Sequence, residues 1–415
     1  MPHPTRRAHL SVRSSRFVPP LPRLVPAIPR GDALALTRAL VATDSRNPSL
    51  APGAPGERAV ADLLAATLRE WGFAVEIADA APGRPNVVAR AGRAGARTLL
   101  LNGHLDTVGV EGMTHAPFSP ESRDGRLHGR GSADMKGGIA AMCAASVRAL
   151  DAGLEGEVIL AAVADEEYAS LGTRALLASG LRADAAIVTE PTRLAICPAH
   201  RGFAWAEVVV EGRAAHGSRY DVGVDAITHA AHVLTELDRF QRETLTARTH
   251  PLLGHASLHA GTISGGIGLS TYPDRCTVSL ERRTLPGERG ADFVAEVESA
   301  VRRAAAGAPG LRARVVPGLV QDPNDVAVDH PLVQALGAAC AAEGWSAPLE
   351  GLSCWTDAAL LTAAGIPAVC FGPGDITLAH AAEEWVPEAE IDRATAILAH
   401  TIAAWCGSGA TAWAS

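Results

Sequence analysis

The sequence predicts an α/β protein, in which a mixed, mainly parallel sheet flanked by helices is interrupted by an inserted α+β domain. Near-continuous apolar runs alternate with helix-spaced segments in both outer parts of the chain, a pattern typical of strands covered on both faces. Between about residues 202 and 314 the order changes to β-α-β-β-α-β, that of a ferredoxin-like unit. The 415 residues suffice for two domains of ordinary size.

The outer parts of the chain carry the α/β pattern. Apolar residues at helical spacing predict helices over 31–42, 57–71, 136–150 and 171–179. Apolar runs predict strands over 86–88, 98–101, 158–163 and 185–188. After residue 317 the alternation returns, with helices expected at 332–343, 356–364 and 391–405 and a strand at 368–371.

The middle of the chain predicts its own small domain. Strands are expected at 204–210, 255–263, 275–285 and 311–316, with helices at 224–240 and 291–306. The main domain must then close its sheet from two stretches, 32–201 and 315–415, around an inserted lid or dimerisation domain at 202–314. Residues 1–31 contain six Arg, several Pro and no acid, so we expect a disordered arm there.

Composition excludes several classes of function. The chain has 37 basic and 45 acidic residues, a net charge of −8, which gives no general attraction to nucleic acid or to anionic membranes. Aromatic residues make up only 4% of the chain, which makes an extended base-stacking surface for single-stranded nucleic acid unexpected. No charge-free apolar run is long enough to span a bilayer. Seven Cys without a C-x-x-C pair argue against a disulfide framework and a thiolate metal site, and favour a reducing cytoplasm.

Histidines and carboxylates follow the ends of the predicted strands. They are His104, Asp106, Asp134, Glu166, Glu167, Glu190 and His380. Because ligands bind at the carboxyl edge of open α/β sheets, residues far apart in sequence are expected to converge there. Nitrogen and oxygen ligands without a thiolate suit Zn²⁺, Co²⁺ or Mn²⁺.

The number of these residues fits two metal ions. A pair of ions needs one bridging carboxylate, for which we expect Asp134, and terminal ligands, for which the sequence offers His104, Glu167, Glu190 and His380. Asp106 lies two residues from His104 on an extended segment and is expected to hold the other imidazole N–H. Adjacent Glu166 and Glu167 point in different directions, so one can bind metal while the other takes a proton from water.

The histidines and carboxylates lie within longer segments that form a recognisable series. In chain order these segments are GHLDTV (103–108), GSADMKGG (131–138), EPT (190–192), GRAAHGS (212–218), PDRC (273–276), RRTLPGE (282–288) and FGPG (371–374) before His380. With these motifs, in the order of the family, the sequence resembles the M20 family of cocatalytic metallohydrolases, which includes acetylornithine deacetylase and succinyl-diaminopimelate desuccinylase. The resemblance covers roughly residues 32–405.

The resemblance implies a zinc-hydrolase-type fold and a role for each residue. Asp134 would bridge two zinc ions and be joined to Met135 by a cis peptide bond. His104 with Glu190, and Glu167 with His380, would complete the two sites, and Glu166 would be the general base. In dimeric relatives the residue matching His216 stabilises the oxyanion in the partner subunit's site, so a homodimer through the inserted domain is expected.

Recognition of the substrate is expected to involve Arg282, Ser270 and Gly372. Two departures from the family pattern affect this expectation. Ser270 stands where many relatives have Asn, and residues 381–384 (AAEE) replace a commoner Thr-containing segment.

We therefore expect a dinuclear zinc amidohydrolase that removes the acyl group from a small N-acyl amino acid. A metallo-carboxypeptidase or dipeptidase with the same site is the enzymatic alternative, with a short peptide as substrate. A non-catalytic, metal-stabilised dimerisation protein is the alternative from another class. Glu166 argues against the latter, because this carboxylate has no ligand role.

Overall fold

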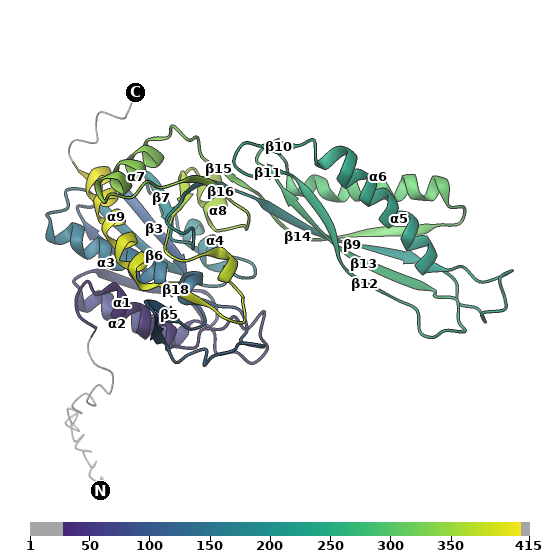
Figure 1. Ribbon diagram of the computed structural model, residues 1–415, viewed down its shortest axis with the longest axis horizontal. Helices are drawn as coiled ribbons and strands as arrows, with labels where there is room; N and C mark the ends of the chain where they lie inside the picture. The colour runs from purple at the N-terminus through teal and green to yellow at the C-terminus, as the bar shows by residue number, and fades with distance from the viewer. Residues whose placement is uncertain (1–27, 408–415) are drawn as a thin grey trace, which may run out of the picture.

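The computed structural model describes residues 28–407, which form a helix-flanked main sheet and a separate antiparallel sheet domain (Figure 1). The main sheet has the order β1-β2-β6-β3-β7-β17-β8-β15, with β16 pairing β8. The central pairs β6-β3, β3-β7 and β7-β17 are parallel, the other pairs along this order are antiparallel, and β16 runs parallel to β8. The strands are β1 (Ala74–Ala81), β2 (Arg84–Gly92), β3 (Thr98–His104), β6 (Glu157–Val163), β7 (Ala185–Val188), β8 (Ile196–His200), β15 (Asn324–Asp325), β16 (Leu349–Leu352) and β17 (Ala368–Cys370).

Helices cover both faces of this sheet because successive side chains of a strand point to opposite faces. In β3, Leu99 and Leu101 pack into one buried cluster, and Leu100 packs into another. The first cluster includes side chains from α1 (Ala33–Val41), α2 (Arg58–Glu70), α3 (Gly137–Asp151), α7 (Pro331–Ala342) and α9 (Glu388–Cys406). The second includes side chains from α4 (Leu171–Ala178) and α8 (Ala358–Ala363).

The middle of the chain forms the antiparallel domain, with element order β9-α5-β12-β13-α6-β14. This is the predicted β-α-β-β-α-β order. Its sheet has the spatial order β12-β13-β9-β14, and α5 and α6 pack on one of its faces around a separate core (Figure 1). The bounds are β9 (Gly202–Glu211), α5 (Ala226–Phe240), β12 (Ser257–Gly265), β13 (Arg275–Thr284), α6 (Phe293–Gly307) and β14 (Arg312–Gln321).

Short elements complete the described chain. A second small sheet has the order β18-β5-β4, and β10 pairs with β11. The bounds are β4 (Glu121–Arg123), β5 (Arg126–His128), β10 (Thr249–His250), β11 (Gly254–His255), β18 (Trp385–Pro387), and the short helical turns η1 (Ser132–Lys136), η2 (Gln241–Leu245), η3 (Gly290–Asp292) and η4 (Ile376–Leu378).

The predicted α/β fold class is confirmed, but four strands of the main sheet, β1, β8, β15 and β16, were not predicted. Strands β15 and β16 are only two and four residues long. Strand β1 leaves much of its surface exposed and therefore lacks a continuous apolar run. Strand β8 is five residues long and contains Pro198, which supplies no N–H to a ladder and so weakens the strand pattern.

The domain limits at 201/202 and 314/315 stay a prediction. The same holds for the expected arm, since residues 1–27 lie outside the described residues. Arg30, near the start of the described residues, forms an ion pair of 2.7 Å with Asp151.

Candidate metal centre

Four of the predicted site residues lie at or just after the carboxyl ends of neighbouring parallel strands. His104 is the last residue of β3, and the register pairs it with Val163 at the end of β6. Glu166 and Glu167 follow β6, and Glu190 comes two residues after the end of β7, which pairs with the other edge of β3. The sheet topology therefore brings these side chains to one edge.

The other two predicted ligands come from segments beside this edge. Asp134 lies in η1, immediately before α3, and the Asp134–Met135 peptide bond is cis. His380 follows η4 in the second outer part of the chain, 246 positions after Asp134 in the numbering.

The carboxylate of Asp134 lies between the two histidines. Nε2 of His104 is 2.9 Å from Oδ1 of Asp134, and Nε2 of His380 is 3.6 Å from its Oδ2. The same atom of His380 lies 2.9 Å from Oε2 of Glu167. Ligand atoms from His104, Asp134 and Glu167 all fall within 4.8 Å of one another.

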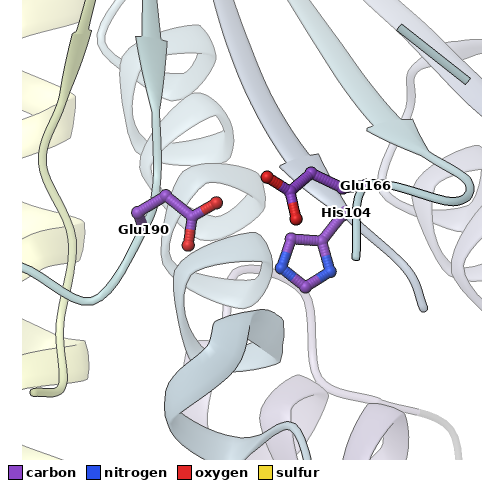
Figure 2. A group of neighbouring side chains, drawn as sticks. All are labelled: His104, Glu166 and Glu190. Carbon is purple, nitrogen blue, oxygen red and sulfur yellow. The ribbon is translucent and has the colours of Figure 1, made fainter. Parts of the chain in front are cut away.

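A second group of donors shares His104. Its imidazole and the carboxylates of Glu166 and Glu190 also lie within 4.8 Å of one another. Figure 2 shows the two carboxylates directed toward the space beside the imidazole from different elements of the chain. His104 and Glu190 are buried, with 2% and 4% of their surfaces exposed.

This set of donors fits divalent cations. Two ligands bound at about 2.0–2.1 Å in a tetrahedral shell lie roughly 3.4 Å apart, and the distances from Asp134 and Glu167 to the histidines are of that size. Burial raises the pKa of Glu166 and of Glu190 well above the usual range, and neighbouring carboxylate charges add to the rise. A cation bound beside these carboxylates would favour their ionised form.

Asp106 connects His104 to the loop that carries Glu166 and Glu167. Its Oδ1 accepts the backbone N–H of Glu166 at 3.1 Å, and its Oδ2 accepts that of Glu167 at 3.2 Å. Its backbone carbonyl lies 2.9 Å from Nδ1 of His104, while the Asp106 carboxylate is 3.8 Å away. The His104 imidazole is therefore oriented mainly by the backbone of Asp106, and the carboxylate holds the loop that carries both glutamates.

A buried network that sequence reasoning missed supports Asp106. Asn47 Nδ2 donates to Asp106 at 2.8 Å and to Asp165 at 3.0 Å. Arg84 donates to the same Asp165 oxygen at 2.9 Å and pairs with Glu57 at 2.6 Å. No local pattern marks Asn47, Glu57 or Arg84, because their partners come from distant parts of the chain.

Two predicted residues lie together at the outer end of the antiparallel domain, away from the metal centre. His216 and Ser270 are exposed. The N–H of Gly217 donates to the carbonyl of Ser270 at 2.7 Å, and the Nδ1 atom of His216 lies 2.9 Å from the hydroxyl of Ser218. Since β9 leads ten residues outward from Gly202, at about 3.3 Å per residue, this end lies roughly 30 Å from the start of the strand.

The structure does not bring Arg282 to the centre. Its side chain is 1% exposed and pairs with Glu288 at 2.6 Å and with Glu296 at 3.5 Å, inside the antiparallel domain. Burial between two acids gives Arg282 a structural role, and no described contact supports its predicted role in binding substrate.

Gly372 lies directly behind the metal centre. A Cβ atom at this position would stand 2.5 Å from the carbonyl oxygen of Thr189 and 2.6 Å from that of Glu190. The glycine therefore allows the chain to pack against the backbone that carries Glu190.

In the described part of the chain, helices long and apolar enough to cross a membrane are absent.

Known proteins are similar to this chain in sequence and in fold. The model of Peptidase family M20/M25/M40 matches residues 100–404. An acetylornithine deacetylase from Myxococcus xanthus is 32% identical over 379 residues, covering 89% of this chain and 96% of the relative. An M20 family metallo-carboxypeptidase from Sulfolobus solfataricus has the same fold, with a TM-score of 0.77, 18% identity and coverage of 90% of this chain and 99% of that chain.

A dinuclear metal binding peptidase of the M20 family from Bacillus subtilis also shares the fold. Its TM-score is 0.68 at 18% identity, and the match covers 89% of this chain and 96% of that chain. The converging ligands, the fold and the family match lead to one conclusion: the chain belongs to peptidase family M20/M25/M40.

Proposed function

We propose that this protein is a dinuclear zinc-dependent amidohydrolase that removes the acyl group from a small N-acyl amino acid. The observation that carries the proposal is the carboxylate of Asp134, whose two oxygens face His104 at 2.9 Å and His380 at 3.6 Å. A bridging ligand requires this arrangement, with one oxygen available to each ion. The acyl class of substrate is supported by the acetylornithine deacetylase that is 32% identical to the chain.

In this proposal each ion has its own terminal ligands. His104 and Glu190 would complete one site, Glu167 and His380 would complete the other, and Asp134 would serve both. Zinc suits these nitrogen and oxygen donors, with cobalt or manganese as substitutes. When bound, the two cations supply Lewis-acid activation of water and of the acyl carbonyl.

The chain's own residues orient the ligands and move the proton. Nδ1 of His104 lies 2.9 Å from a carbonyl oxygen, which only accepts hydrogen bonds, so this nitrogen carries the hydrogen and Nε2 is the ligand atom. Glu166, whose N–H is held by Asp106, accepts a proton from the attacking water. It then delivers that proton to the leaving amine as the amide bond breaks.

A peptidase is the second candidate, because the same residues would hydrolyse a peptide bond. The fold shared with the metallo-carboxypeptidase from Sulfolobus solfataricus supports it. The two candidates differ in the group on the acyl side of the scissile bond.

Assays on a panel of N-acetyl amino acids, N-succinyl amino acids and dipeptides test the proposal. After dialysis against a strong chelator we expect no hydrolysis, and zinc or cobalt should restore cleavage of an N-acyl amino acid. Cleavage confined to dipeptides would favour the peptidase. Metal-loaded protein that cleaves no member of the panel would favour the non-catalytic, metal-stabilised protein.

We also propose a homodimer in which the antiparallel domain supplies His216 to the partner's site. The exposure of His216 and the length of β9 support this proposal, since they place the residue far from the start of that strand. A cytoplasmic location is proposed on the strength of seven cysteines that form no disulfide.

A further inference from the structure

We propose that Glu384 is a positioning residue that holds Asp134 and His380 at the separation needed for metal binding. This inference rests on the proposed dinuclear centre and concerns a residue outside its ligand set. Glu384 follows His380 by four positions and lies 250 positions beyond Asp134. Its side chain is buried, with 1% of its surface exposed.

The carboxylate of Glu384 is surrounded by donors from the loop that carries Asp134. Oε1 accepts the backbone N–H groups of Ala133 at 3.0 Å and of Asp134 at 3.1 Å. Oε2 accepts the backbone N–H of Gly131 at 2.9 Å and the guanidinium of Arg130 at 2.8 Å. Both oxygens are therefore used, each by two donors.

Arg130 extends this connection to two further segments. Its Nε donates to the carbonyl of Gly109 at 3.0 Å, in the loop that follows Asp106. Its Nη2 lies 3.3 Å from the carbonyl of Ala381, the residue after His380. The pair Arg130–Glu384 thus joins the segments that carry Asp106, Asp134 and His380.

The segment carrying His380 needs such an anchor. His380 has a φ of 60°, in the left-handed region that residues other than glycine rarely adopt. Its side chain is 55% exposed, so burial does not hold it. Two contacts fix the backbone that follows His380. The carbonyl of Glu384 accepts the N–H of Gly129 at 3.2 Å, and Arg130 donates to the carbonyl of Ala381.

Only a carboxylate satisfies all these donors. In Glu384→Gln the amide nitrogen would replace one oxygen and face N–H groups instead of accepting from them. The loop carrying Asp134 would have to shift relative to His380. Changes in residues that support metal ligands typically lower metal affinity or activity 10- to 100-fold.

The test measures cobalt binding to metal-free protein by titration and by the visible absorption of the bound ion. Wild type should bind two Co²⁺ per chain. Glu384→Gln should bind cobalt 10- to 100-fold more weakly with an altered spectrum, and Glu384→Asp, which keeps the charge, should recover part of the affinity. The matched control is Glu383→Gln, the same change at the exposed neighbouring residue, which should behave as wild type.

Thermal unfolding separates positioning from simple stability. A Glu384→Gln chain that unfolds at a lower temperature but binds cobalt with wild-type affinity and spectrum would overturn the inference. Wild-type protein that binds no cobalt would instead overturn the proposed centre itself. If Glu384→Gln does not fold, cobalt binding is measured on Arg130→Lys instead. This variant keeps the positive charge but loses the hydrogen bonds of the guanidinium to the carbonyls of Gly109 and Ala381. Wild-type cobalt affinity in Arg130→Lys would overturn the inference, and weaker binding would support it.

Discussion

Nε2 of His104 lies 2.9 Å from Oδ1 of Asp134, although the two residues are 30 positions apart in the sequence and belong to different elements, β3 and η1. The second oxygen of the same carboxylate faces His380. One side chain in η1, just before α3, is therefore placed to serve two ligand groups, and this position determines what its loss should do.

Asp134→Ala should remove both metal ions and abolish hydrolysis. Without the shared negative charge, two cations would repel each other at close range. Changing either histidine removes a ligand from one site only, so His104→Ala and His380→Ala should each retain part of the bound metal. Metal analysis of the three purified variants, together with turnover, checks this order. Equal residual metal and rate in all three would contradict a bridging role for Asp134.

Glu166→Gln should keep metal content near that of wild type and lower kcat by about 10²–10⁴, the usual scale for loss of a general base. The amide keeps the shape of the side chain but cannot take up the proton. Metal content and kcat are measured on the same preparation.

The adjacent change Glu167→Gln is the matched control. Glu167 lies 2.9 Å from His380, so this variant should lose metal as well as rate. If the behaviours of the two variants are exchanged, the assignment of base and ligand between the neighbours must be reversed.

His216→Ala should lower kcat by about 10²–10³ with metal retained, the scale for loss of an oxyanion-stabilising donor. If His216 acts in the partner's site, mixing this variant with Glu166→Gln should restore activity. A mixed dimer contains one site that combines an intact Glu166 with an intact His216 from the other subunit.

Subunit exchange must be demonstrated independently, for example with two tags of different size. Exchange without recovery of rate would place His216 in the site of its own subunit. A monomer in solution would exclude action on a partner.

The stability of the metal-free protein should depend on His200 below neutral pH. Burial lowers the pKa of this histidine from 6.5 to about 4, only partly offset by hydrogen bonds to backbone carbonyls. His200 becomes protonated below pH 6.5 in the unfolded chain but only near pH 4 in the folded chain. The contribution of this histidine to the free energy of unfolding is therefore fully present above pH 6.5 and is lost as the pH falls toward 4. Between pH 7 and pH 5 this single group accounts for a loss of about 2 kcal/mol.

Denaturant unfolding in the presence of chelator measures this loss. The free energy of unfolding of His200→Gln should fall less than that of wild type over the same pH range, by about 2 kcal/mol. Parallel pH profiles for the two proteins would show that His200 is not buried in its neutral form.

The sequence alone determined the α/β class, the β-α-β-β-α-β domain and the residue types of the candidate metal centre. These features depend on local information. Apolar runs such as that of β3 and β6 form strands wherever a core covers them, and residues that follow parallel strands must meet at one edge of the sheet. His104 and Glu190 were predictable together for this reason.

Only the tertiary structure decided which groups hold these ligands in place. Glu384 reaches N–H groups 250 positions away, and Asn47 joins Asp106 to Asp165 across two loops. Arg282 was expected to contact substrate, but its buried side chain pairs with the partly buried Glu288 inside the antiparallel domain. A buried polar group is satisfied by whatever donors or acceptors the fold brings within about 3 Å, and no periodicity along the chain records that distance.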